Sequence, residues 1–397
     1  MNFELLAETE NAEEPVSIVV IGAGGGGSNA VNGMIERGIR GVKFVAVNTD
    51  KQALRNNKAG IKLQIGSQLT GGRGAGGVRE VGEEAALEDK DKIAEVLEGA
   101  DMVFVTAGMG GGTGTGSAPV IAEIAKKQGA LTVGVVTKPF DFEKSHRMEI
   151  AEMGIARMRE VVDTLIVIPN QRLLNNVDRK TSIPEAFRRA DDILRQGVQS
   201  ISDSIVETGL INIDFADAMT VMKDQGDALM AIGYGAGENR VEEAVSSVLD
   251  NPLLEDTSIK GATRALIYVA GGEDLPLVEY DDVVRRITAD MDKNAIIIPG
   301  MYLDSSLADK IRVTLIATGF SSKKELEKEE VSKSSSARSE IISGREFDSC
   351  FGSGLYTDYL PPRGEKREEH RYTSEDLDVP TVIRDRRVYN NYTGETL

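Results

Sequence analysis

A glycine-rich run, Gly108–Pro119, contains the residues whose types and spacing point most directly to chemistry. It follows an apolar segment, Met102–Ala107, that is typical of a buried strand, and it precedes Val120–Lys127, which has the pattern of a helix. Backbone N–H groups in such a turn close around phosphate oxygens, with the helix N-terminus directed at the negative charge. No Gly-Lys-Ser/Thr sequence follows, so this is not a Walker A motif. The run predicts a phosphate-binding turn of another kind.

Two more glycine runs occupy comparable positions along the chain. Gly22–Gly27 follows an apolar segment in a GxGxxG frame, and Gly71–Gly77 follows the third expected strand. Alone, the first run would equally predict a dinucleotide site, with Asp50 near the place of a ribose-binding acid. Three turns from three strand ends of one sheet would converge on one ligand, which favours a mononucleotide. For each run taken singly, a tight structural turn remains the alternative.

The elements that must position these turns alternate between strands and helices. Apolar, strand-like segments separated by helical patterns imply a parallel sheet covered on both faces. A long helix then begins at Ser182–Glu185, which has the form of a capping box, and keeps an apolar face to Ile205. Its ~25 residues would span close to 40 Å, which suits a bridge between two domains, although an ordinary long helix has the same pattern. The strands are expected near residues 16–22, 42–48, 61–65, 101–107, 131–137 and 164–169.

A second unit is expected over residues 209–319, as a smaller mixed sheet backed by helices. Its strands are predicted at 262–270, 295–299 and 310–317, and its helices near 216–232, 240–249 and 278–291. From Ser321 to Ser374 the chain is too polar to offset chain entropy by burial, so disorder is expected. Directly after this region, residues 376–387 form an apolar and basic island, either a partner-docking peptide or a chance patch.

Composition excludes several classes of function. A net charge of −18 argues against nucleic-acid binding and against adhesion to anionic lipid. The single cysteine, Cys350, excludes an internal disulfide and favours a reducing compartment. No apolar run reaches ~18 residues, so no direct membrane insertion is expected, and the acidic N-terminus lacks a leader pattern. Two histidines make a histidine-based metal site or catalytic triad a poor explanation.

The run Gly108–Ser117 resembles the tubulin signature of the FtsZ/tubulin GTPase family, in the form found in bacterial FtsZ. The resemblance extends from about Val16 to Gly319 and returns near the C-terminus. It implies a self-assembling cell-division GTPase in the cytoplasm at mid-cell, with GTP as substrate and Mg²⁺ as cofactor. The expected fold is α/β, with a Rossmann-like GTP-binding domain (15–177), a central helix (178–207) and a smaller α+β domain (208–319). A disordered N-terminus (1–14), a disordered linker (320–374) and a partner-binding peptide (375–397) complete it.

The resemblance also implies which residues bind GTP. Glu143 would bind the ribose hydroxyls, and Arg147 would lie near the base or sugar. Asp191 would accept hydrogen bonds from the N1–H and N2–H₂ edge of guanine, with Phe187 stacked on the ring. From the residues alone, Glu143 and Arg147 would be a surface ion pair and Asp191 a solvated helix residue. The other expected contacts are Gly25, Gly26, Gly27, Ser28, Asn29, Gly74, Ala75, Gly76, Gly111, Gly112, Thr113, Gly114 and Thr115.

A third segment, Gly209–Asp217, resembles the loop that enters the nucleotide pocket of the next FtsZ subunit. The resemblance implies that Asp214 and Asp217 position the attacking water, with Asn212 nearby, in a head-to-tail homopolymer. It further implies that residues 376–387 bind membrane-anchored division adaptors such as FtsA. The alternative for the aspartates is helix capping, which would leave a non-hydrolysing filament or nucleotide sensor. A dinucleotide-dependent oxidoreductase built on the first glycine run is the other competing hypothesis.

Two positions depart from the family pattern. Lys144 stands where FtsZ members usually have glycine, and Val78 stands where they often carry Asn-Pro. Val78 lacks a side-chain donor near the expected phosphates. Nucleotide affinity or hydrolysis rate is therefore expected to differ from the family norm.

Overall fold

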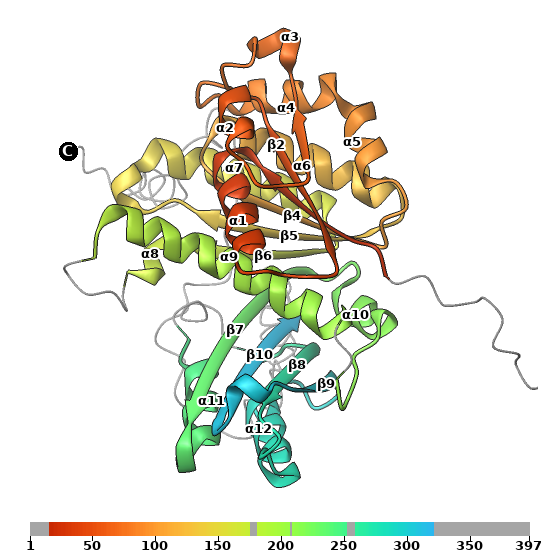
Figure 1. Cartoon of the computed structure of the whole chain (residues 1–397), viewed down its shortest axis with the longest axis vertical. Helices are drawn as coiled ribbons and strands as arrows, with labels where there is room; N and C mark the ends of the chain where they lie inside the picture. Colours follow the sequence, from red (N-terminus) through yellow and green to blue (C-terminus); the bar gives the residue numbers. More distant parts are fainter. Residues whose placement is uncertain (1–15, 175–180, 207–208, 252–258, 321–397) are drawn as a thin grey trace, which may run out of the picture. The chain divides into compact units, whose positions relative to one another are not determined.

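The computed structural model describes residues 16–174, 181–206, 209–251 and 259–320 (Figure 1). The expected disordered N-terminus, the tail from residue 321 on and the 376–387 island lie outside the described residues. The strands are β1 Ile18–Ala23, β2 Val42–Asn48, β3 Ile61–Gln64, β4 Met102–Gly108, β5 Leu131–Lys138, β6 Thr164–Pro169, β7 Gly226–Ala236, β8 Arg264–Gly271, β9 Ile296–Leu303 and β10 Lys310–Thr318.

The helices lie between these strands as the alternating pattern predicts. They are α1 Gly24–Glu36, α2 Lys51–Arg55, α3 Ser67–Thr70, α4 Arg79–Glu88, α5 Lys90–Leu97, α6 Gly112–Lys127, α7 Ser145–Val161, α8 Asn170–Leu173, α9 Ile183–Val206, α10 Phe215–Met222, α11 Arg240–Leu249 and α12 Leu277–Thr288. A short 3₁₀ turn, Asp141–Glu143, precedes α7.

The first six strands form a parallel sheet in the order β3-β2-β1-β4-β5-β6. This is the Rossmann order, in which the direction of winding reverses between β1 and β4. All six strands match the expected segments. The ligand position in such sheets is the crevice outside the carboxyl ends of the strands at the reversal point.

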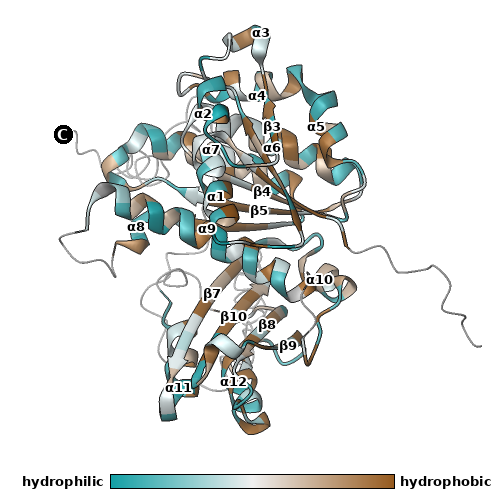
Figure 2. Cartoon of the chain, in the orientation of Figure 1, coloured by the Kyte–Doolittle hydropathy of each residue, from teal (hydrophilic) through white to brown (hydrophobic). Residues whose placement is uncertain are grey.

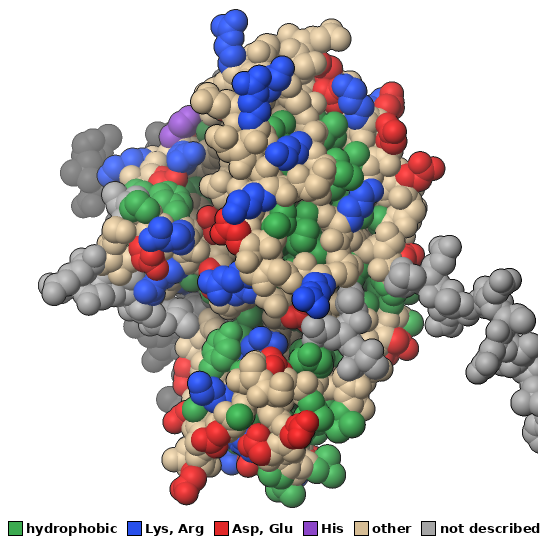
Figure 3. All heavy atoms as spheres, viewed as in Figure 1, with side chains coloured by type: hydrophobic (Ala, Val, Ile, Leu, Met, Phe, Trp, Pro, Cys, Tyr) green, Lys and Arg blue, Asp and Glu red, His purple; other side chains and the backbone are tan. Residues whose placement is uncertain are grey.

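Both faces of this parallel sheet are buried, which explains why its strands read as continuous apolar runs. Every residue of β1 is buried, and in β4 all are buried except Gly108. One core lies under α1 and α9 and includes Val20, Phe104 and Leu194; the other includes Ile21, Val105 and Ile121. Figure 2 shows the central strands as hydrophobic and the outer helix surfaces as largely hydrophilic. Basic and acidic side chains are interspersed on the face shown in Figure 3.

The prediction of a helix over residues 216–232 is wrong for the second half of that range. α10 ends at Met222, and β7 begins at Gly226 after a turn in which Asp224 has φ 55° and Gly226 has φ 71°. The helix ends at the extended backbone of Lys223, and the left-handed residues that follow turn the chain into β7. The apolar residues of the range 216–232 belong to α10 and β7, and their spacing fits a single helix, which explains the wrong prediction.

β7 joins the two parts of the sheet. Its first residues pair in parallel with β6, and the rest pairs antiparallel with β10, which is itself antiparallel to β8. The result is one ten-stranded sheet that is parallel in β1–β6 and mixed in β7–β10. The expected α/β class with a parallel and a mixed part is confirmed, but the mixed strands continue the parallel sheet through β7 instead of forming a separate sheet. The domain boundaries stay predictions.

The expected long helix is α9, with 24 residues. Ala190, Leu194, Val198 and Ile201 form its buried face against the sheet. At its start, the Glu185 N–H donates to Ser182 Oγ at 3.4 Å, which supplies one half of the expected capping box. Among the described residues, no helix is both long enough and apolar enough to cross a membrane.

Candidate functional site

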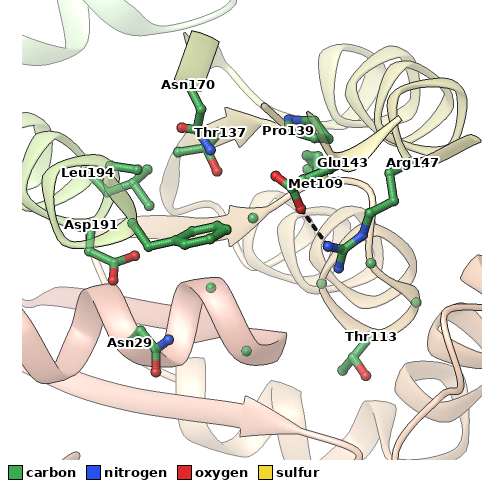
Figure 4. Close-up of a pocket in the computed structure, with 18 residues that line it drawn as sticks. Asn29, Met109, Thr113, Thr137, Pro139, Glu143, Arg147, Asn170, Asp191 and Leu194 are labelled. Atoms are coloured by element: carbon green, nitrogen blue, oxygen red, sulfur yellow. Dashed lines mark hydrogen bonds and ion pairs between the residues drawn. The ribbon is translucent and has the colours of Figure 1, made fainter. Parts of the chain in front are cut away.

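A cavity of about 410 Å³ opens at the carboxyl ends of β1, β4 and β5, at the reversal point of the sheet (Figure 4). The turns after β1 and β4 form its floor, and α7 and α9 supply side chains from its walls. The lining residues that the sequence predicted are Gly25, Gly26, Asn29, Gly111, Gly112, Thr113, Gly114, Glu143, Arg147, Phe187 and Asp191. Residues from the two turns and from α9 are therefore brought together as expected.

The two glycine turns pack closely on each other, and at Gly24 and Gly26 the packing leaves no room for a side chain. A Cβ added to Gly24 would lie 2.6 Å from the backbone nitrogen of Gly114, and one added to Gly26 would lie 3.0 Å from Gly108. By contrast, a Cβ on Gly25 would meet nothing within 4 Å, because it would point into open space. The close packing sets the N-terminal ends of α1 and α6 beside one cavity.

Neither of these helix ends is neutralised by the protein. α1 and α6 have no side-chain hydrogen bond at their N-caps and no acidic residue in their first turns. The first N–H groups of a helix lack partners within the helix, and its dipole places partial positive charge there. Two uncapped helix N-termini around one cavity are suited to the phosphates of a nucleotide.

Three predicted contacts lie behind the cavity instead of lining it. A Cβ on Gly27 would lie 2.2 Å from the Thr106 carbonyl oxygen, so this glycine permits close packing of α1 on β4. Thr115 accepts a hydrogen bond from the Gly110 N–H at 2.9 Å, which fixes the second turn. Ser28 is buried, and its hydroxyl has no hydrogen-bond partner among the described residues.

The third glycine turn packs on the second and does not line the cavity. A Cβ on Gly112 would lie 2.8 Å from the backbone nitrogen and oxygen of Val78 and 2.9 Å from Ala75 Cβ. Gly74 and Gly76 have φ values of 92° and 60°, which require glycine in this turn. Contact of Gly74, Ala75 and Gly76 with the nucleotide stays a prediction.

Glu143 and Arg147 line the cavity and also form the ion pair that local spacing suggests. Arg147 Nη1 lies 2.5 Å from Glu143 Oε2, and Glu143 Oε1 accepts from the Phe140 N–H at 3.0 Å. The glutamate side chain is 10% exposed and the arginine side chain 52%. Figure 4 shows the two side chains facing each other at one side of the cavity. This side of the cavity therefore offers a carboxylate that can accept hydrogen bonds from hydroxyl groups and a guanidinium group that can bind an anion.

Lys144, directly after this pair, has φ 75° and ψ 167°. This region of backbone conformation is accessible essentially to glycine alone. The observation explains why glycine suits this position and why a lysine here is strained.

The far wall of the cavity combines a carboxylate with an aromatic cluster. Asp191 projects from α9 opposite Asn29 of α1 (Figure 4), and burial raises the pKa of Asp191 to about 7. Phe187, one turn earlier, is 39% exposed and makes an edge-on contact with Phe140 at a centroid distance of 5.3 Å. An exposed ring beside a buried carboxylate is suited to a planar base that donates N–H groups.

Sequence reasoning missed several lining residues, of which Asn170 is the most informative. Asn170 is 5% exposed, and its Oδ1 has no hydrogen-bond partner among the described residues. It directly follows β6, so a polar residue at the carboxyl end of a parallel strand was the available signal. Gly108 and Met109, which also line the cavity, belong to the predicted phosphate-binding turn although they were not among the expected contacts. The other missed lining residues are Thr137, Pro139, Ala190 and Leu194.

Asp50 serves a structural role. It is the N-cap of α2, where its Oδ1 accepts from the N–H groups of Gln52 at 2.7 Å and Ala53 at 3.2 Å. It does not line the cavity. A ribose-binding acid of a dinucleotide site is therefore absent from this position.

Asn212, Asp214 and Asp217 lie at the start of α10 and do not line the cavity of their own chain. Asp214 is the N-cap of α10, because its Oδ1 accepts from the Asp217 N–H at 2.7 Å. Asn212 Oδ1 accepts from the Gly209 N–H at 2.5 Å. Asp214 therefore caps α10, and its second carboxylate oxygen has no hydrogen bond within the described residues, so both the capping alternative and the catalytic role stay predictions.

Comparisons with known proteins agree with this geometry. Residues 17–178 match the GTPase domain of the Tubulin/FtsZ family, and residues 226–321 match the C-terminal domain of the FtsZ family. An FtsZ dimer structure from M. jannaschii is 47% identical, with a TM-score of 0.74, and the match covers 78% of this chain and 89% of that one. A point mutant of the same protein gives 47% identity, a TM-score of 0.74, and coverage of 77% and 92%.

A more distant structure shares the fold alone. CetZ2 from Haloferax volcanii, described as a GTPγS-bound protofilament, is 19% identical with a TM-score of 0.64, and the match covers 82% of this chain and all of that one. The two matching family domains and the 47% identity over most of the chain decide the assignment. This chain belongs to the FtsZ family of tubulin-like GTPases.

Proposed function

We propose that this protein assembles head to tail into filaments of the cell-division ring and hydrolyses GTP at the contact between subunits. One observation carries the proposal. The only carboxylates among the described residues that line the cavity are Glu143, which is engaged by Arg147, and Asp191, which lies on the α9 wall. Neither belongs to the glycine turns at the phosphate end, so a carboxylate that positions water there would be supplied from outside this cavity lining.

The nucleotide roles follow from the two ends of the cavity. The β- and γ-phosphates lie over the turns at Gly25–Gly26 and Gly111–Gly114, where N–H groups are free. Glu143 accepts from the ribose hydroxyls, and Arg147 lies near the sugar or base. Asp191 accepts from the N1–H and N2–H₂ groups of guanine, which adenine lacks, while Phe187 stacks on the ring.

Asp214 and Asp217 of one subunit act in the pocket of the next. A water oxygen attacks the γ-phosphorus, the bond to the β–γ bridging oxygen breaks, and GDP and phosphate result. The aspartates orient the water and accept its proton, with Asn212 shaping the loop that carries them. Capping by Asp214 is compatible with this role, because one carboxylate oxygen caps α10 and the other is available.

The described residues fit a magnesium ion held mainly by the nucleotide. Mg²⁺ keeps several waters and binds through few carboxylates together with substrate phosphates. The part of the chain that is described has no cluster of three or more His, Cys, Asp and Glu side chains suited to a metal. When bound, Mg²⁺ neutralises charge on the β- and γ-phosphates.

Assembly and location complete the proposal. The neighbours from this fold include an FtsZ dimer and a CetZ2 protofilament, which supports self-association. Head-to-tail contacts are heterologous and do not close, so they produce filaments. We place the protein in the cytoplasm at the mid-cell division site, with residues 376–387 binding membrane-anchored adaptors such as FtsA.

The variant Asp214→Asn tests the catalytic part of this proposal. Asparagine retains the oxygen that caps α10 but removes the negative charge, so the fold is preserved. GTP binding is expected to remain at the wild-type level, whereas phosphate release falls at least tenfold. Asp214→Ala serves as the comparison that loses both cap and charge. Wild-type turnover in the asparagine variant would remove this loop from catalysis.

A further inference from the structure

α10, the eight-residue helix that follows Asp214, has three of its C-terminal carbonyl groups bonded to side chains of other elements. The last four carbonyl groups of a helix have no partner within the helix. In α10 each of the four has one. Met219 O accepts from the Lys223 N–H at 2.9 Å, Val221 O accepts from Thr318 Oγ1 at 2.7 Å, Thr220 O accepts from Arg264 Nη1, and Met222 O accepts from Thr164 Oγ1.

The three side-chain donors come from three different strands. Thr164 begins β6, Arg264 begins β8 and Thr318 ends β10. Both threonines are fully buried. Because β6 belongs to the parallel part of the sheet and the other two to the mixed part, the end of α10 is tied to both parts. Figure 1 shows α10 beside the mixed part, where it contacts β8 and β9.

The loop before α10 is held as well. Ile211 exchanges backbone hydrogen bonds with Met301 of β9, at 3.2 and 2.9 Å. Ile213 is buried over Gly300, where an added Cβ would lie 2.5 Å from Ile213 Cδ1. The segment that carries the two aspartates is thus fixed at both ends, and the aspartates do not line the cavity of their own chain.

Arg264 is the charged member of this set. A cation at the C-terminus of a helix interacts favourably with the helix dipole, and hydrogen bonds from charged donors are stronger than neutral ones. The helix extends roughly 12 Å for eight residues, and Arg264 binds the Thr220 carbonyl in its last turn, at the end opposite Asp214. Any effect of Arg264 on hydrolysis must pass through the orientation of α10.

We propose that Arg264 is a positioning residue for GTP hydrolysis in the neighbouring subunit. By holding the Thr220 carbonyl it fixes the axis of α10, so that Asp214 and Asp217 enter the next pocket in one orientation. The inference rests on the proposed function, in which these aspartates act in trans. Small displacements of catalytic groups reduce rates steeply, about a hundredfold for 1 Å in sensitive cases.

The first experiment compares Arg264→Ala with Arg264→Lys. Phosphate release at saturating GTP is expected to fall about tenfold or more in the alanine variant, with GTP affinity unchanged. Lysine supplies a charged donor without the planar guanidinium, so it should restore part of the rate. Arg285→Ala is the matched control, because Arg285 forms an exposed ion pair with Asp281 inside α12. A variant that loses GTP binding would overturn a role in positioning alone.

A mixing experiment locates the defect. Gly25→Asp places a carboxylate at the phosphate end of the cavity without a steric clash, so this variant has a blocked pocket and an intact loop. Mixed with Arg264→Ala, it should give turnover well above the sum of the two separate rates, because the intact loop serves the intact pocket. Absence of recovery would overturn the proposal.

Asp214→Asn separates the two levels of the argument. Loss of turnover in Asp214→Asn with wild-type turnover in Arg264→Ala would refute only the role of Arg264. Wild-type turnover in both would refute the proposed action of the loop in trans.

Discussion

The nucleotide cavity and the α10 segment differ in whether the backbone polar groups at their helix ends have hydrogen-bond partners. At the cavity, α1 and α6 leave their N-terminal N–H groups uncapped and carry no acidic residue in the first turn. At α10, Asp214 caps the N-terminus and all four C-terminal carbonyls have partners. Open donors bind a ligand, whereas a fully bonded helix holds its side chains in one place. Under the proposed function, the open helix ends would receive the phosphates and the α10 segment would carry Asp214 and Asp217 into the next subunit.

Closing the open region should have the largest effect. Gly25→Asp puts a negative charge among the N–H groups that receive phosphate, and its Cβ meets no protein atom within 4 Å. GTP affinity is expected to fall at least a hundredfold, about 2.7 kcal/mol, as measured by titration with a fluorescent GTP analogue. Gly33→Asp adds the same charge further along α1, also in open space, and should retain most of the affinity. Equal losses in both would argue for a general charge effect.

Asp191 at the base end should have the next largest effect. Asp191→Asn removes a charged acceptor, so GTP affinity is expected to fall about 10- to 100-fold, in line with hydrogen bonds to charged groups. The preference for GTP over ITP, which lacks the N2 amino group, should shrink at the same time. Competition titrations with the two nucleotides measure both. An unchanged preference would remove Asp191 from base recognition.

The pKa of Asp191 predicts a pH dependence with a definite sign. Burial raises this pKa from 3.8 to about 7, and only the carboxylate accepts both guanine hydrogen bonds. GTP affinity should therefore rise with pH by about 10- to 100-fold in total, level off above about pH 7, and show a flat profile in Asp191→Asn.

Without nucleotide, the same raised pKa has the opposite consequence for stability. Folding favours the protonated side chain. The stability that this preference contributes is therefore fully present below about pH 4 and is lost as the pH rises through 7. At pH 8 the free Asp191→Asn protein should be more stable than wild type by a few kcal/mol, because one pKa unit corresponds to about 1.4 kcal/mol. Urea unfolding of both proteins at pH 5 and pH 8 measures this difference. An equal gap at the two pH values would contradict it.

Removing a hydrogen bond from the C-terminal end of α10 should lower the stability of the protein. Thr318→Val keeps the shape of the side chain but leaves the buried Val221 carbonyl without its donor. The free energy of unfolding should fall by about 1–3 kcal/mol, measured by urea denaturation. Thr288→Val is the control, because that hydroxyl donates to a carbonyl within its own helix, α12, at 2.9 Å. A similar loss in both variants would show that the carbonyls of α10 are not special.

The smallest expected effect is at Lys144, beside the cavity. Lys144→Gly relieves a backbone conformation that is accessible essentially to glycine, so stability should rise by about 1 kcal/mol. Lys144→Ala removes the amine but keeps the strain, and should give no such gain. Thermal unfolding of the three proteins compares them, and an equal gain from alanine would assign the effect to charge.

The sequence predicted the parallel part of the fold better than the mixed part. β1 and β4 are buried on both faces and followed by glycine turns, so their continuous apolar runs could be recognised from the sequence alone. β7 was missed because its pairing with β6 and β10 is long-range, and its apolar residues continue the helical spacing of α10. The turn at Asp224–Gly226 was the available signal.

Residue type and spacing predicted the cavity-lining residues on the glycine turns, but not those at the ends of β5 and β6. Gly25 and Gly112 line the cavity because strand-to-helix turns must lie at the carboxyl edge. Glu143 and Asp191 were assigned by family resemblance, since their local patterns indicate only an ion pair and a helix surface. Asn170 was missed because its unpartnered oxygen is visible only once the sheet is assembled.

The most direct test of the central claim is phosphate release from GTP with Mg²⁺ over a range of protein concentrations, with light scattering recorded in parallel. If one subunit supplies the phosphate cradle and the next supplies Asp214 and Asp217, turnover per subunit should begin above a threshold concentration, together with scattering. Turnover strictly proportional to protein from the lowest concentration would mean that each subunit contains a complete active site, and would contradict the account.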